Sequence, residues 1–161
     1  MTIKVGEKLP NATLRLVTAD GARPVTTQEF FDGKKVVLFG LPGAFTPTCH
    51  KNHLPGFLAD EAAFKAKGVD VIAMTSVNDQ YVLAAWSTAT GSDGHIDFLA
   101  DGAAEFAKAT GLDFDASAGG LGVRSRRYSM LIEDGVVKVL NIEESPGKAD
   151  LSGAAHLLGQ M

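Results

Sequence analysis

Short, continuously apolar segments alternate with helix-like segments along this chain, and this alternation constrains the fold more than any other feature. Three apolar segments have the length of buried strands and are bounded by turn residues: Val36–Phe39, Val69–Thr75 and Ile96–Leu99. Each is followed by apolar residues at helical spacing, over residues 49–67, 80–90 and 103–110. Strands that alternate with helices predict an α/β protein with parallel strands.

The second half of the chain adds an antiparallel element to this pattern. Two apolar runs, Tyr128–Ile132 and Val136–Ile142, flank Asp134-Gly135, which is a strong hairpin signal. We also expect a closing helix over residues 151–158 and an early strand over residues 13–17. The fold is therefore predicted as a central mixed sheet flanked by helices, in a single domain spanning residues 1–161.

Two local details of this prediction concern turn-forming residues. Pro55-Gly56 lies inside the helical segment 49–67, so we expect a kink or break there. Ala116–Gly122 is rich in glycine and small residues and is expected to be a flexible stretch.

Composition excludes several classes of function. The net charge is −4 with charges of both signs interspersed, and the three arginines between Arg124 and Arg127 are too few for a nucleic-acid footprint. No apolar run approaches the roughly 18 residues that a membrane-spanning helix needs. The first eleven residues lack the apolar centre of a secretory signal, so we expect a cytoplasmic protein. One cysteine and four scattered histidines predict no metal site.

The only cysteine, Cys49, stands where a loop enters a helix. The loop before it contains Pro42 and Pro47 and follows a buried strand. At the start of a helix, free backbone N–H groups and the positive end of the helix dipole favour a thiolate, which is the nucleophilic form of cysteine. An inert cysteine could occupy any buried position, so this placement favours a reactive thiol.

Side chains near Cys49 in sequence or fold could support that reactivity. The hydroxyl of Thr46 could hydrogen-bond the sulfur or an oxygen held against it, and Pro42 and Pro47 stiffen the loop. An arginine just before the strand Tyr128–Ile132 could face the cysteine and stabilise both a thiolate and a departing oxyanion. The residues alone do not distinguish Arg124, Arg126 and Arg127 in this role.

Four motifs together closely resemble the peroxiredoxins. Residues Pro42–Cys49 have the pattern P-x-x-x-T-x-x-C of the peroxidatic motif in that family. His53–Phe57, Ser76–Asp79 and Arg127–Met130 resemble the type II or peroxiredoxin-5 subfamily. The resemblance covers nearly the whole chain and implies a thioredoxin-like fold and a thiol-dependent peroxidase.

The resemblance also implies a role for individual residues. Cys49 would be the peroxidatic cysteine, Thr46 would hydrogen-bond the sulfur and the peroxide, and Pro42 would shield the site. Arg127, rather than Arg124 or Arg126, would be the activating arginine. The backbone N–H groups of Thr48 and Cys49 would hold the peroxide oxygens.

One departure from the family pattern bears on how the enzyme is recycled. Many relatives carry a second, resolving cysteine, but the corresponding regions here, Ala73–Thr75 and Leu151–Gly153, have none. Cys49 would therefore form a sulfenic acid that only an external thiol can reduce. Glutathione with or without glutaredoxin is the expected reductant, and thioredoxin is the alternative. The resemblance further implies a homodimer and no cofactor beyond the thiol.

Other functions remain open from the residues. A thiol transferase is permitted by the layout, although the chain has no C-x-x-C motif. A non-enzymatic peroxide sensor that passes its oxidation to a partner would use the same Cys49, and an inert cysteine in a binding module is the plainest alternative. Near the site, we expect His50 to face solvent, His53 to support the loop, and Trp86 to lie in the core or at the rim.

Overall fold

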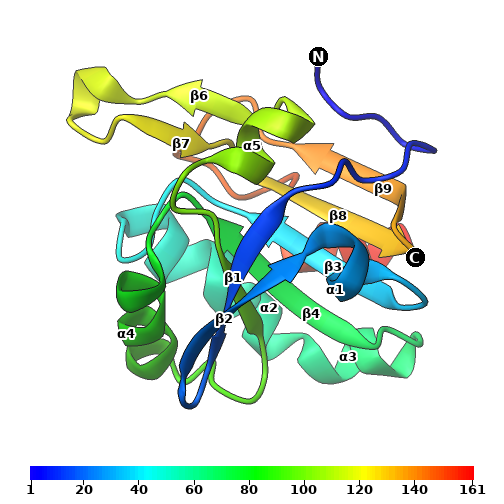
Figure 1. Cartoon of the computed structure of the whole chain (residues 1–161). Coiled ribbons are helices and arrows are strands. Elements are labelled where there is room, and N and C mark those ends of the chain that lie inside the picture. Colours follow the sequence, from blue (N-terminus) through cyan, green and yellow to red (C-terminus); the bar gives the residue numbers. More distant parts are fainter.

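Seven strands form one mixed sheet at the centre of the molecule. The computed structural model describes all 161 residues. The strands lie in the order β2-β1-β5-β4-β3-β8-β9 (Figure 1). Their bounds are β1 Thr13–Thr18, β2 Gly21–Thr26, β3 Lys35–Gly40, β4 Val71–Ser76, β5 Asp97–Ala100, β8 Tyr128–Glu133 and β9 Val136–Ile142. β3, β4 and β5 are parallel, whereas β1–β2, β1–β5, β3–β8 and β8–β9 are antiparallel. The predicted mixed sheet is confirmed.

Helices cover both faces of this sheet. They are α1 Thr27–Phe31, the π-helix η1 Cys49–His53, α2 Leu54–Ala59, α3 Glu61–Ala66, α4 Gln80–Thr90, α5 Glu105–Thr110 and α6 Ala154–Gly159. A short hairpin of β6 (Asp113–Asp115) and β7 (Val123–Ser125) stands apart from the main sheet, with a 3₁₀ turn at Ser117–Gly119 between its strands (Figure 1). That turn lies within the stretch expected to be flexible. None of the helices combines the length and hydrophobicity needed to cross a lipid bilayer.

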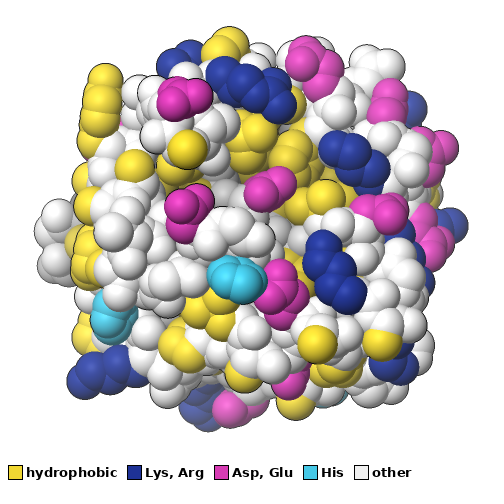
Figure 2. Space-filling view, turned by 90° about the horizontal axis from the view of Figure 1, so that it is seen from below, with side chains coloured by type: hydrophobic (Ala, Val, Ile, Leu, Met, Phe, Trp, Pro, Cys, Tyr) yellow, Lys and Arg dark blue, Asp and Glu magenta, His cyan; other side chains and the backbone are white.

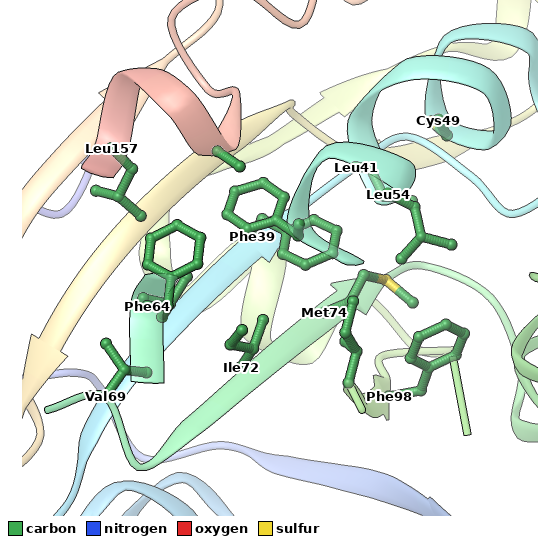
Figure 3. Close-up of a cluster of buried hydrophobic side chains, with 14 of the residues drawn as sticks. Phe39, Leu41, Cys49, Leu54, Phe64, Val69, Ile72, Met74, Phe98 and Leu157 are labelled. Carbon is green, nitrogen blue, oxygen red and sulfur yellow. The ribbon is translucent and has the colours of Figure 1, made fainter. Parts of the chain in front are cut away.

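The central strand β3 divides the hydrophobic core into two layers. Val37 and Phe39 belong to the cluster packed under α2, α3, α4 and α6, while Val36 and Leu38 belong to the cluster under α1 and α5. Alternate side chains of a strand point to opposite faces, so a strand buried on both sides reads as a continuous apolar run. Figure 3 shows the first cluster, which extends from Leu157 past Phe39 to Cys49.

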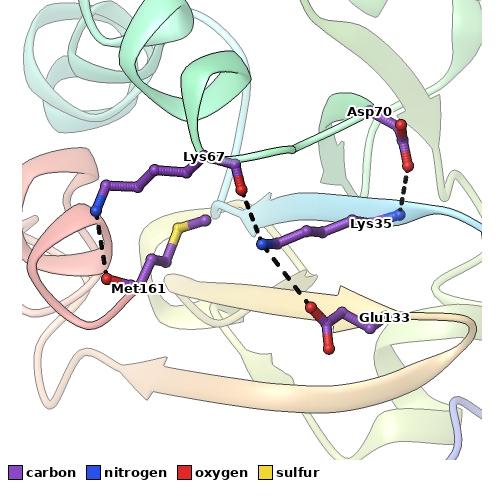
Figure 4. A network of polar contacts seen from close by, with 5 residues as sticks. All are labelled: Lys35, Lys67, Asp70, Glu133 and Met161. Atoms are coloured by element: carbon purple, nitrogen blue, oxygen red, sulfur yellow. Dashed lines mark hydrogen bonds and ion pairs between the residues drawn. The ribbon is translucent and has the colours of Figure 1, made fainter.

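The two ends of β3 have different surroundings. At its start, the Lys35 ammonium donates to the Lys67 carbonyl (2.9 Å) and pairs with Glu133 (3.8 Å), and Lys67 in turn donates to the Met161 carbonyl (3.3 Å; Figure 4). These exposed contacts contribute little each. At its other end, Gly40 faces the ring of Tyr128 on β8 and leads into the loop of Cys49.

Several elements differ from the sequence-based prediction. The early strand exists, but its hairpin partner β2 was not predicted, because Pro24 argues against a strand anywhere except at a sheet edge, which is where β2 lies. The helical segment 49–67 divides twice: the π-helix η1 gives way to α2 at Leu54, directly before the Pro55-Gly56 pair where a kink or break was expected, and α2 ends at Ala59. Pro55 lies in the first turn of α2, where a missing N–H is tolerated.

The surface carries interspersed charges, as the sequence predicts. Lysine and arginine alternate with aspartate and glutamate over the face shown in Figure 2, with apolar side chains scattered between them.

The closing helix begins at Ala154, three residues later than expected, because residues 144–153 form an irregular segment that lies beside the site described next.

Candidate active site

Cys49 opens the π-helix at the end of the loop that follows β3. Its side chain is fully buried and belongs to the hydrophobic core. The N–H of Leu54 donates to the Cys49 carbonyl, which closes the wide π turn, a feature frequent at functional sites. The backbone N–H groups of Thr48 and Cys49 donate to no other group of the chain, as expected for the first turn of a helix. Two unpaired N–H groups thus adjoin Cys49 in the chain.

Arg127 lies against the sulfur of Cys49. Its Nη2 donates to Sγ at 3.0 Å, and the whole side chain is 2% exposed. The residue directly precedes β8, which pairs with β3, so the sheet brings together two residues 78 positions apart. A buried guanidinium at this distance stabilises negative charge on sulfur.

The other two arginines have different surroundings. Arg124 donates to the carbonyls of Leu121 (3.0 Å) and Pro42 (3.2 Å) and so braces the loop before Cys49. Arg126 lines a small neighbouring pocket and makes no side-chain hydrogen bond. Of the three candidates, only Arg127 contacts Cys49.

A pocket of about 340 Å³ opens beside these residues. Of the predicted site residues, Pro42, Thr46, Thr48 and Arg127 line it, whereas the fully buried Cys49 does not. The rest of its wall is mostly apolar or backbone: Pro47, Phe114, Ala116, Gly119, Leu121, Pro146 and Gly147. The Thr46 hydroxyl donates to the Gly43 carbonyl at 2.6 Å instead of to the sulfur, so its oxygen remains available as an acceptor.

His53 links Arg127 to the irregular segment 144–153. Arg127 Nη1 lies 3.0 Å from His53 Nδ1, and His53 Nε2 lies 3.0 Å from the Ser152 carbonyl. A guanidinium can only donate and a carbonyl can only accept, so Nδ1 carries the lone pair and Nε2 the proton. Burial, with the Arg127 charge as the second cause, lowers the pKa of His53 to about 3. His53 is therefore neutral and fixes the orientation of the guanidinium.

Known proteins are similar to this chain over nearly its whole length. Residues 4–158 match the Redoxin family. Peroxiredoxin-2E-2, chloroplastic, of Oryza sativa subsp. japonica is 51% identical over 98% of this chain and 72% of its own length. The structure of reduced Prx3 in complex with hydrogen peroxide from Vibrio vulnificus is 48% identical, with a TM-score of 0.93 over 99% of both chains. Peroxiredoxin 5 from Alvinella pompejana is 34% identical, with a TM-score of 0.84 over 98% of both chains.

The chain belongs to the redoxin family and is a type II peroxiredoxin. Its fold is thioredoxin-like, as the resemblance implied, and it is an enzyme that reduces peroxides with electrons from a thiol.

One prediction about this peroxiredoxin's site is wrong. His50 was expected to face solvent, but it is only partly exposed, and its Nδ1 accepts a hydrogen bond from Trp86 Nε1 at 2.9 Å. Phe45 stacks on His50 with ring centroids 5.8 Å apart and also lies beside Trp86, at 6.3 Å. The widened π turn directs His50 toward α4, an orientation that regular helical spacing does not predict.

The sequence reasoning missed most of the support around Arg127. The spacing of His53, four residues after Cys49, was a usable signal because such residues share one side of a helix. The carbonyl groups of Pro146, Gly147 and Ser152 gave none, since a backbone acceptor has no signature in the sequence.

Proposed function

We propose that Cys49 is the peroxidatic nucleophile and that Arg127 activates it. The observation that carries this proposal is the 3.0 Å contact between Arg127 Nη2 and Cys49 Sγ in a buried setting. The guanidinium stabilises the thiolate before reaction, and water is too scarce there to screen its charge.

The chemical step forms an S–O bond and breaks the O–O bond of the peroxide. The Cys49 thiolate attacks the terminal peroxide oxygen, and the departing oxygen takes up a proton and leaves as water or an alcohol. Negative charge develops on both oxygens, so Arg127 and the free N–H groups of Thr48 and Cys49 would hold them. The Thr46 oxygen would accept a hydrogen bond from the incoming peroxide, and Pro42 would limit entry of water.

The proposed substrates are hydrogen peroxide and alkyl hydroperoxides. The Vibrio vulnificus relative is described in complex with hydrogen peroxide. The pocket of about 340 Å³ is much larger than that molecule, and its apolar walls, such as Phe114 and Leu121, suit an alkyl group.

We propose that the resulting sulfenic acid is reduced by an external thiol. The thiol attacks Cys49 to give a mixed disulfide and water, and a second thiol then releases the Cys49 thiol and a disulfide product. Glutathione, alone or with glutaredoxin, is the proposed reductant, with thioredoxin as the alternative. The support is the single cysteine of the chain, which leaves no partner for an internal disulfide.

We also propose an assembly and a cell compartment for the protein. A homodimer would cover Phe45, which is 50% exposed in the loop before Cys49. The cytoplasm, where thiols are kept reduced, suits an enzyme that works through one free cysteine. No cofactor beyond the reducing thiol is proposed.

Steady-state turnover tests both the enzyme and its reductant. With hydrogen peroxide as oxidant, we expect continuous turnover when glutathione and glutaredoxin are added, and none for Cys49→Ser. Turnover with thioredoxin alone would show that thioredoxin, and not glutathione, is the reductant. A single stoichiometric oxidation with every reductant, followed by a trapped disulfide to another protein, would instead support a sensor that relays its oxidation.

A further inference from the structure

The irregular segment after β9 supplies backbone acceptors to three residues of the site. We define residues 144–153 as the strap. The Pro146 carbonyl accepts from Arg127 Nε (3.1 Å), the Gly147 carbonyl accepts from the Thr48 hydroxyl (3.2 Å), and the Ser152 carbonyl accepts from His53 Nε2 (3.0 Å). Each of these distances is that of a normal hydrogen bond. The strap therefore orients the residues around Cys49 without contributing a side chain to them.

The strap has no helix or strand of its own to hold its shape. Residues 144–148 are exposed, and few backbone hydrogen bonds form within the strap: Lys148 N–H donates to Ser145 (3.2 Å) and Gly153 N–H to Asp150 (3.4 Å). A segment of this kind needs an anchor, because ordering each free residue costs roughly 1–2 kcal/mol of backbone entropy.

Glu143 is placed to be that anchor. Its carboxylate is buried, with the residue 5% exposed, and accepts three backbone N–H groups, from Asp150 (3.2 Å), Leu151 and Ser152 (3.3 Å). Its own backbone N–H donates to the Arg127 carbonyl at 2.9 Å, so the residue stands directly opposite Arg127 where β8 and β9 begin to diverge. No ion pair joins the two side chains.

These contacts form one continuous chain of hydrogen bonds. It runs from the Glu143 carboxylate to the backbone of Ser152, then to His53, then to Arg127, and ends on Cys49 Sγ. Every member of the chain is buried. Buried groups bonded in this way hold a single geometry because rotation of any of them leaves a polar group unpaired.

We propose that Glu143 is a positioning residue of the peroxidatic site: by holding the strap it fixes His53 and Pro146, and through them the orientation of Arg127 on Cys49. This inference rests on the proposed roles of Cys49 and Arg127. Glu143 touches neither the peroxide pocket near the sulfur nor Cys49 itself, so it acts only through the residues it holds.

The substitution Glu143→Gln tests the anchor with little change in volume. An amide keeps one acceptor oxygen and replaces the other with an NH₂ group, which would face a backbone N–H and lose at least one of the three bonds. Misplacing a reacting group by about 1 Å can cost on the order of 100-fold in rate, so we expect E143Q to react with hydrogen peroxide about 10- to 100-fold more slowly. The matched control is E144Q, which changes the neighbouring exposed glutamate whose side chain makes no hydrogen bond and should react as wild type.

A double-mutant cycle separates positioning from a general loss of structure. The second-order rate constant of the Cys49 thiol with hydrogen peroxide is measured for wild type, E143Q, R127A and the double variant, with folding checked by circular dichroism. If Glu143 acts through Arg127, E143Q slows wild type by about tenfold or more but slows R127A by less than about threefold, because the two changes affect one unit.

Two results would overturn the inference. One is an E143Q rate constant within about threefold of that of wild type. The other is that E143Q lowers the rate constant by the same factor in wild type and in R127A, because two independent effects would combine in this way. If E143Q does not fold, Glu143→Asp, which keeps the charge but shortens the reach, takes its place in the same cycle under the same criteria. A slow wild type, or an R127A variant as fast as wild type, would reject the proposed function instead.

Discussion

Replacing Arg127 with alanine is the perturbation whose effect can best be estimated from the structure. The substitution removes the donor at 3.0 Å from Cys49 Sγ. A hydrogen bond to a charged group contributes about 1.5–3 kcal/mol, which here stabilises the thiolate. The same guanidinium would stabilise the departing peroxide oxygen, and removing one such donor typically costs about 2.7–4 kcal/mol.

The two effects together predict a loss of roughly three to five orders of magnitude, since each 1.36 kcal/mol is a factor of about ten. The assay is stopped-flow measurement of Cys49 thiol loss in excess hydrogen peroxide, giving a second-order rate constant for each variant. Arg124→Ala is the matched control. Arg124 bonds only to backbone carbonyls, so its loss is expected to cost at most about tenfold through the loop it braces.

Folding must be shown to be intact for the R127A comparison to hold. The loss of the side chain leaves His53 Nδ1 and the Pro146 carbonyl without their donors, which should lower the melting temperature without abolishing the fold. An R127A variant that is folded and reacts within about tenfold of wild type would refute the reasoning, because no single missing oxyanion donor is expected to cost so little.

Three further predictions follow from His53 and Gly40. His53→Gln, whose amide can accept from Arg127 and donate to the Ser152 carbonyl, should keep the peroxide rate within about tenfold, whereas His53→Leu should lower it further, as stopped-flow kinetics will test. Because the pKa of His53 falls from 6.5 unfolded to about 3 folded, the unfolding free energy should be highest above pH 6.5 and fall by roughly 3–5 kcal/mol toward pH 3. Urea titrations at several pH values measure this free energy, and an equal decrease in H53Q would contradict the prediction. Gly40→Ala should destabilise by about 1–3 kcal/mol, since a Cβ there would overlap the Tyr128 ring, while Gly159→Ala, in a helix with open space around it, should not destabilise the protein.

The sheet and the central residues of the site could be predicted from the sequence for physical reasons. The run that contains Val37 and Phe39 is apolar on both faces, which marks an interior strand, and the Asp134-Gly135 pair marks the hairpin. Cys49 was identified because its placement at a helix entrance is itself a chemical signal. The choice of Arg127 over its neighbours came from the family resemblance, and the geometry now supplies a reason in the contact with Sγ.

What the sequence did not predict depends on the backbone. The strap contributes carbonyl groups, which every residue has, so the chain of hydrogen bonds from Glu143 to Cys49 has no pattern in the sequence. The position of His50 depended on the π turn, and no residue pattern marked the end of α2 at Ala59. Local propensity cannot reveal such features because tertiary contacts decide them.

The most direct test of the account is the rate at which stoichiometric hydrogen peroxide consumes the Cys49 thiol in the wild-type protein at neutral pH. We predict a second-order rate constant orders of magnitude above that of free cysteine, because Arg127 donates to Cys49 Sγ at 3.0 Å. A rate constant like that of free cysteine would contradict the account, because the contact between Arg127 and Cys49 would then activate nothing.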